Sequence, residues 1–256
     1  MTLFIDERGD PNAPTLLFLH AGGLSSRQWT PQMGALAEFH RLAPDLPEQG
    51  RSVDVGPLTL EYTLPLLADL IETRASGGRV HCIGSSLGGT LALSLLAERP
   101  ALFESVIVSG SASKIGPRLA RIAEVSNRLT YRLLPQKWLA WLTAQSMRVR
   151  PAYDALIADD LTRSATLEFS QRTLDMLVAG TRPARADRLL IVVGQKETVA
   201  AKAAAREAAR EIEGATSVIV PAGRHLWNLQ YPELFTDMIR AWVTGAPLPE
   251  ALKRED

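Results

Sequence analysis

The sequence lacks the features that define several classes of protein. Among its 256 residues there is a single cysteine, Cys82, which excludes a disulfide-stabilised scaffold. The 28 Lys and Arg residues balance the 28 Asp and Glu residues, and a zero net charge gives no support to a broad nucleic-acid-binding surface. No apolar run approaches the roughly 18 residues that a membrane-spanning helix needs.

The amino terminus also lacks the elements of a secretion signal. Residues 1–10, MTLFIDERGD, carry two acidic side chains within the first seven positions, and no basic segment precedes an apolar run. We therefore expect a cytoplasmic protein that binds neither nucleic acid nor membrane. Composition leaves the oligomeric state open.

Apolar residues are plentiful by comparison. They make up 46% of the chain, which is enough for a sizeable core and, with zero net charge, excludes disorder as the main state. One domain of this length is ordinary. Short apolar segments alternate with helical patterns along most of the chain, and this alternation predicts an α/β fold with a mostly parallel central sheet flanked by helices. The expected strands are 15–19, 40–43, 79–83, 105–109, 188–193 and 216–220, and the expected helices are about 26–39, 58–75, 91–98 and 198–213, with a last helix opening at 232.

The alternation stops between residues 111 and 183. Only helical periodicity is found there, with Pro117, Pro135 and Pro151 at expected helix starts. We therefore predict that residues 1–110 and 184–256 form the α/β core and that residues 111–183 are an inserted all-helical cap. Residues 111–188 hold 13 Lys or Arg against 7 Asp or Glu, so the neutral total hides a basic insertion in an acidic core.

The strongest chemical signal is the segment 84–88, Gly-Ser-Ser-Leu-Gly, which fits G-x-S-x-G between an expected strand and an expected helix. A serine hydroxyl is a weak nucleophile, so it must be presented at a sharp turn beside a base. Gly84 and Gly88 leave room for that turn, and the N–H of Leu87 can face a developing oxyanion. The alternative is an ordinary strand–helix turn, and the strand–turn–helix context favours Ser86 as a nucleophile.

Of the four histidines, His225 is best placed to act as the base. Catalytic groups collect at the carboxyl ends of parallel strands, and His225 lies in the loop directly after the expected strand 216–220. We interpret His40 and His81 as structural residues and His20 as a residue that shapes its loop.

A third group should orient the imidazole and stabilise its protonated form. Glu197 is the only carboxylate in the loop that follows the expected strand 188–193, whereas Asp187 precedes that strand and lies at its opposite end. The alternative is that Glu197 only acidifies the first turn of the next helix. Residues 109–113 offer no Asp or Glu in its place, which strengthens the assignment of Glu197.

A second oxyanion donor is expected from the loop His20-Ala21-Gly22-Gly23. Small residues let the backbone approach a substrate closely, and spacing does not choose between Gly22 and Gly23. The alternative role of this loop is a flexible connection between strand and helix.

Five segments follow one another along the chain: LLFLHAGG, APDLPEQGRS, IGSSLGG, GQKE and AGRHLWNLQYPELF. Together, in this order, they resemble the α/β-hydrolase superfamily, and the resemblance spans essentially the whole chain. Four positions depart from the usual pattern: Ala21 replaces a glycine, Gln49 a frequent histidine, Glu197 the commoner aspartate and Arg224 a frequent glycine. The serine at the turn argues against the branches that use an aspartate nucleophile.

The resemblance implies a hydrolase that cleaves a small-molecule carboxylic ester or lactone through an acyl-enzyme, without a cofactor or metal. A thioesterase, a carbon–carbon bond hydrolase or an acyltransferase would use the same three groups, and these alternatives stay open. A non-catalytic small-molecule receptor would keep the fold, but it has no physical need for a complete set of Ser86, His225 and Glu197.

Large side chains of the expected cap are candidates for the substrate pocket. Trp138 and Trp141 share a helical face, although packing of the cap against the core explains them at least as well. The basic cap also admits the steering of an anionic substrate, but we favour a solvated face of amphipathic helices. The candidates are Tyr131, Trp138, Trp141, Met147 and, beside His225, Trp227.

Overall fold

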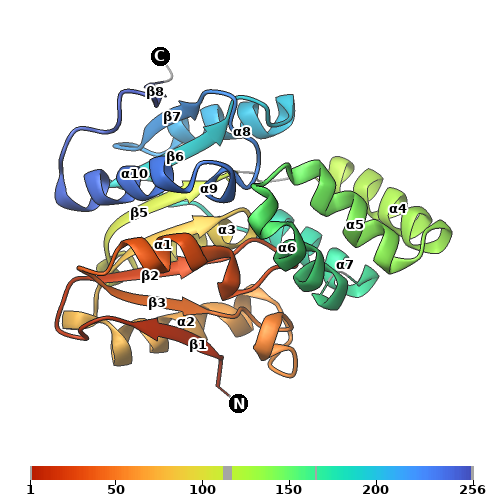
Figure 1. The fold of residues 1–256 in the computed structure, drawn as a ribbon, viewed down its shortest axis with the longest axis horizontal. Coiled ribbons are helices and arrows are strands. Elements are labelled where there is room, and N and C mark those ends of the chain that lie inside the picture. The colour runs from red at the N-terminus through yellow and green to blue at the C-terminus, as the bar shows by residue number, and fades with distance from the viewer. Residues whose placement is uncertain (1, 112–116, 165, 255–256) are drawn as a thin grey trace.

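The computed structural model describes residues 2–111, 117–164 and 166–254, and within them an eight-stranded sheet forms the centre of the molecule (Figure 1). The strand order is β1-β3-β2-β4-β5-β6-β7-β8, which confirms the predicted fold class. The strands are β1 (Ile5–Arg8), β2 (Thr15–Leu19), β3 (His40–Pro44), β4 (Val80–Ser85), β5 (Phe103–Ser109), β6 (Leu189–Gly194), β7 (Thr216–Val220) and β8 (Lys253–Arg254).

Strands β2 to β7 run parallel, and only the edge strands β1 and β8 are antiparallel to their neighbours. Every residue of β2, β3, β4 and β6 is buried, because helices cover both faces of a parallel sheet. The edge strands were not predicted, since they are short and partly or fully exposed.

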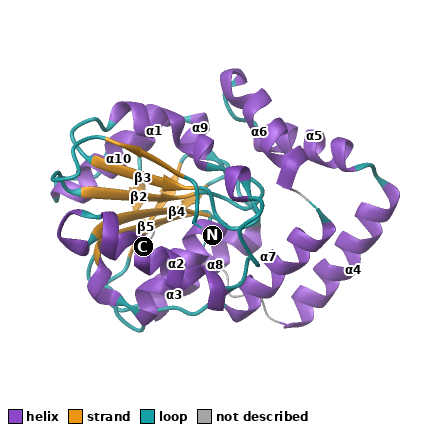
Figure 2. Cartoon of the chain, turned by 90° about the horizontal axis from the view of Figure 1, so that it is seen from below, coloured by secondary structure: helices purple, strands orange, loops and turns teal. Residues whose placement is uncertain are grey.

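Helices cover the sheet in two layers (Figure 2). Leu64, Leu91 and Ala205 belong to the apolar cluster under α2, α3 and α8, and Met33 and Phe235 belong to the cluster under α1 and α10 on the opposite face. These helices are α1 (Thr30–Ala35), α2 (Leu60–Arg74), α3 (Leu87–Glu98), α8 (Val199–Glu211), α9 (Trp227–Gln230) and α10 (Pro232–Thr244).

One predicted helix differs from the structure. The expected continuous helix over 26–39 is a 3-10 helix, Ser26–Trp29, followed by the short α1, because the backbone of Trp29 (φ −94°, ψ 5°) departs from α-helical geometry between them. Helix α3 also begins at Leu87, four residues before its predicted start, so it opens directly at the serine turn.

Within the described residues, four helices lie between β5 and β6 in the sequence, and they stand beyond the carboxyl ends of the strands (Figure 1). We call them the inserted helices: α4 (Pro117–Leu133), α5 (Gln136–Met147), α6 (Pro151–Ser164) and α7 (Leu167–Ala179). Helix α4 packs mainly on α7, and α5 packs mainly on α6. The predicted insertion runs from residue 111 to residue 183, and its residues 112–116 and 165 lie outside the described residues.

No helix in the described ranges is both long enough and apolar enough to cross a bilayer.

Candidate active site

Ser86 occupies a strained turn between β4 and α3. Its φ of 50° and ψ of −112° lie outside the regions that residues other than glycine favour. The surrounding backbone enforces this turn. A Cβ atom on Gly84 would lie 2.6 Å from the carbonyl oxygen of Gly88, and a Cβ on Gly88 would lie 2.2 Å from that of Leu19. Only glycine fits at either position, and the hydroxyl-bearing residue stands at the carboxyl edge of the sheet.

His225 and Glu197 form a hydrogen-bonded pair at the same edge. Nδ1 of His225 lies 2.9 Å from Oε2 of Glu197, although the two residues are 28 positions apart. The Glu197 side chain is only 3% exposed, and its Oε1 accepts a hydrogen bond of 3.1 Å from the N–H of Gly194 at the end of β6. An ionised carboxylate only accepts hydrogen bonds, so this contact suits the tautomer that carries a proton on Nδ1, in which Nε2 keeps its lone pair.

Gly110 is a site residue that the sequence analysis missed. It follows β5 with φ +61°, and a Cβ at this position would lie 2.9 Å from Nδ1 of His225 and 3.5 Å from Oε1 of Glu197. Any side chain there would press on the pair. The available signal was a glycine directly after an expected central strand.

The loop after β2 brings Gly22 and Gly23 next to the serine turn. The N–H of Gly23 donates to Oε1 of Gln49 over 2.7 Å, so it is occupied within the protein. A Cβ on Gly22 would lie 3.6 Å from the Cβ of Leu87, which places Gly22 against the first residue of α3. The geometry therefore favours the N–H of Gly22 over that of Gly23 as the second oxyanion donor. The first is the N–H of Leu87, one of the unpaired donors at the start of a helix.

Two side chains fix the shape of this loop. Nε2 of His20 accepts from the N–H of Leu46 at 2.9 Å and its Nδ1 donates to the carbonyl of Ala21 at 2.9 Å. Burial lowers the pKa of His20, which keeps the ring neutral and able to accept. Gln28, also missed in the sequence, accepts from the N–H of Ala21 at 2.8 Å.

The other two histidines lie away from this edge. Nδ1 of His40 contacts Oγ1 of Thr15 at 3.1 Å, inside the sheet. Nδ1 of His81 contacts Oγ of Ser105 at 2.8 Å on the neighbouring strand, and burial lowers the pKa of His81 to about 4.

A cavity of about 590 Å³ lies where α5, α7 and α8 meet the carboxyl edge of the sheet. Both Ser86 and His225 line it, and among the described residues no hydrogen bond joins their side chains. Contacts of this kind are often long in ligand-free enzymes and shorten when substrate binds. Arg224 lines the cavity as well. The inserted helices contribute Ser146, Met147 and Leu177 to its wall.

Of the predicted pocket residues, only Met147 is in the cavity wall. Trp138 and Trp141 are exposed on α5, and Tyr131 is half-buried on α4, where burial raises its pKa. Trp227 is fully buried in the core, and its Nε1 donates to Oγ of Ser109 at 2.8 Å. The structure therefore gives Trp227 a packing role below the histidine loop and no place in the cavity wall.

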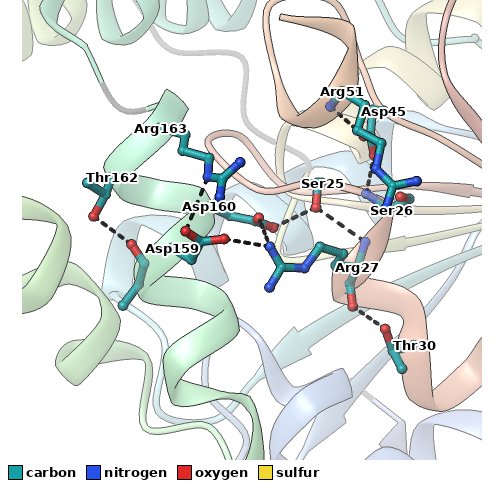
Figure 3. Close-up of polar contacts among 11 residues, drawn as sticks. Ser25, Ser26, Arg27, Thr30, Asp45, Arg51, Asp159, Asp160, Thr162 and Arg163 are labelled. Atoms are coloured by element: carbon teal, nitrogen blue, oxygen red, sulfur yellow. Dashed lines mark hydrogen bonds and ion pairs between the residues drawn. The ribbon is translucent and has the colours of Figure 1, made fainter.

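A polar cluster joins the inserted helices to the loop after β2 (Figure 3). Oγ of Ser25 donates to Oδ2 of Asp160 on α6 over 2.6 Å, and Nη1 of Arg27 lies 3.0 Å from Oδ1 of the same carboxylate. Asp160 is buried, and this burial raises its pKa despite the two partners. Asp45 holds the core side of the cluster, because its Oδ1 accepts from the N–H of Ser26 at 2.6 Å.

Among the residues that the structure describes, no three His, Cys, Asp or Glu side chains lie together as a metal ion would require.

Comparison with known proteins places the chain in a family. A sequence model of the Alpha/beta hydrolase family matches residues 16–238, and the chain belongs to this family. An AB hydrolase superfamily protein from Gibberella zeae is 28% identical over 254 residues, covering 95% of this chain and 85% of the relative. 3-Oxoadipate enol-lactonase 1 from Acinetobacter baylyi is 31% identical over 115 residues, covering 44% and 43% of the two chains.

Solved structures agree on the fold. A thermophilic esterase from Thermogutta terrifontis superposes with a TM-score of 0.76 at 22% identity, covering 95% of this chain and 93% of the esterase.

Proposed function

We propose that this protein is a serine hydrolase that cleaves carboxylic esters, lactones included, through an acyl-enzyme on Ser86. The observation that carries the proposal is the pair formed by His225 and the buried Glu197, 2.9 Å apart, on the cavity that Ser86 also lines. The esterase and enol-lactonase relatives support an ester as the bond cleaved.

In the proposed reaction, Nε2 of His225 takes the hydroxyl proton of Ser86 as the oxygen attacks the substrate carbonyl. Glu197 holds the ring in the tautomer that leaves Nε2 unprotonated and stabilises the imidazolium that forms. The N–H groups of Leu87 and Gly22 donate to the tetrahedral oxyanion. His225 then protonates the leaving alcohol and activates the water that releases the acid.

We further propose that the inserted helices act as a cap. They supply Ser146, Met147 and Leu177 to the cavity, so they shape the space beside the reacting serine. Ser86, Glu197 and His225 all come from the sheet-bearing segments. In this division, the core performs the chemistry and the inserted helices select the substrate.

Covalent labelling with a fluorophosphonate probe tests the nucleophile without knowledge of the substrate. We expect the wild-type protein to be labelled, Ser86→Ala to remain unlabelled and His225→Ala to react far more slowly. Ser126→Ala, which removes an exposed hydroxyl on α4, is the control and should be labelled like the wild type. A folded wild-type protein that resists the probe would contradict the proposal and favour a binding protein.

A panel of esters, lactones and thioesters then measures kcat on the same variants. Glu197→Gln should lower kcat by roughly a thousandfold or more, because the wrong tautomer is then stabilised. Asp187→Asn is the matched control, since Asp187 is exposed and pairs with Arg185 at the other end of β6. Equal losses in the two variants would show that the acid is misassigned.

A further inference from the structure

Helix α4 carries a stripe of apolar side chains that the rest of the described structure leaves exposed. Ile122, Val125, Leu129 and Leu133 are 56–67% exposed, and their spacing of three, four and four residues places them on one side of the helix. The opposite side packs on α7, where Nδ2 of Asn127 donates to Oγ of Ser170 over 2.7 Å. The stripe therefore faces away from the helix that α4 packs on.

Helix α5 continues this apolar character. Trp138, Trp141 and Leu142 are 47–62% exposed, whereas Ala140 and Ala144 on the other side of α5 are buried. The two indole rings meet edge to face, with their centroids 6.4 Å apart. We call the exposed apolar side chains of both helices the α4–α5 apolar surface. It comprises Ile122, Val125, Leu129, Leu133, Trp138, Trp141 and Leu142.

Basic side chains flank this surface. Arg121, Arg128 and Arg132 are exposed on α4 with spacings of seven and four residues, which aligns them along one side of the apolar stripe. Lys137 is exposed at the start of α5. The only acidic residue in 120–147 is Glu124, and it pairs with Arg128 at 2.7 Å. Among the described residues, Arg121, Arg132 and Lys137 have no carboxylate partner.

The exposed apolar side chains and the basic side chains beside them distinguish between two partners that could cover this surface. A second copy of the chain, related by a two-fold axis, would place the same surface against itself. Glu124 is the only acidic residue in 120–147, so the second copy would bring more cations and almost no carboxylates to pair with them. An anionic lipid surface supplies the opposite charge. Tryptophan is enriched at the level of lipid headgroups, and helices with one apolar and one basic side lie in the membrane interface.

We propose that the α4–α5 apolar surface binds the interface of an anionic lipid bilayer. The apolar side chains enter the boundary between headgroups and acyl chains, and the arginine row contacts lipid phosphates. The sequence predicts no membrane partner because it lacks a spanning segment, but binding at the interface needs no such segment. Ser146 and Met147, at the end of α5, line the cavity, and α5 is about 18 Å long, so binding holds the cavity near the bilayer.

Sedimentation of the full chain with vesicles tests this proposal, and it is independent of the proposed reaction because no substrate is needed. We expect the protein to sediment with vesicles of equal parts phosphatidylglycerol and phosphatidylcholine, and only weakly with phosphatidylcholine alone. The variant Trp138→Ser/Trp141→Ser should bind roughly tenfold more weakly. Val53→Ser, which changes another exposed apolar residue on the core, is the matched control and should bind like the wild type.

The charge requirement is tested separately. Arg121→Gln and Arg132→Gln should each weaken binding to the anionic vesicles by roughly fivefold, and added salt should weaken it in the wild type. Circular dichroism checks that each variant is folded. Equal binding to both kinds of vesicle, absence of binding, or a dimer in light scattering that Trp138→Ser/Trp141→Ser dissociates would overturn the proposal. The last result would identify a second copy as the occupant.

Discussion

The sheet and the inserted helices bury their apolar residues to very different extents. Strands β2, β4 and β6 are buried along their whole length and lie between two apolar clusters. On α4 and α5, side chains such as Leu129 and Trp138 leave more than half of their surface in solvent. Since burial of apolar surface is the main source of stability, we infer that the fold depends chiefly on the sheet. The sequence of α4 and α5 is then available for contacts outside the chain.

The largest expected difference between the regions lies in the cost of truncating one leucine. Leu91→Ala on α3 removes a fully buried side chain and should lower the free energy of unfolding by about 3 kcal/mol. Leu129→Ala on α4 should lower it by less than about 0.5 kcal/mol. Urea unfolding at neutral pH measures both values. Similar losses would mean that α4 is packed against another surface in solution.

The junction between the two regions should show a smaller effect. Ser25 and Asp160 share a hydrogen bond of 2.6 Å in a buried cluster, so a double-mutant cycle with Ser25→Ala and Asp160→Ala should give a coupling of about 1–2 kcal/mol. The exposed pair Arg163–Asp159 on α6 is the control, and its coupling should be no more than about 0.5 kcal/mol. If the two cycles agree, α6 is not held to the core through Asp160.

Between pH 7 and pH 5, the titration of histidine should affect the stability of the core. The pKa of His81 is about 4 in the folded protein and about 6.5 in the unfolded chain, so the unfolded state binds more protons between these values. The free energy of unfolding therefore falls as the pH drops from 6.5 to 4. His81→Gln should reduce this fall, as measured by urea unfolding at pH 7 and pH 5. An unchanged fall would assign it to other groups; residues 111–183 contain no histidine.

The fold could be predicted where an apolar run in the sequence is buried in the structure. The central strands lie in an apolar setting on both faces, so runs such as residues 15–19 were recognisable from the sequence. The edge strands β1 and β8 could not be found, because their pairing depends on neighbours distant in the sequence while their side chains are exposed. The break at Trp29 is likewise set by tertiary packing, since this side chain is fully buried among Phe18 and Phe235.

The candidate site divides in the same manner. Ser86, Glu197 and His225 could be proposed because each follows an expected strand at the same sheet edge, and residue type and position carry the signal together. The roles of Gly110 and Gln49 could not be proposed from the sequence. Gly110 matters for the space that it leaves open, and Gln49 acts through a backbone N–H that is 26 residues away. Such roles exist only after the chain has folded.

The inserted helices leave the sheet after β5 and return at β6, two strands that are hydrogen-bonded neighbours from Val106↔Leu189 to Ser109↔Val192. The insertion therefore begins and ends on adjacent strands, and the pairing register of these strands does not depend on its length. An exchange of this segment for a helical segment of another size would leave the proposed catalytic residues on the unchanged core, provided that the contact made by Asp160 is replaced. In evolution and in protein engineering, the segment is a unit through which new specificity can be acquired while the reaction is inherited.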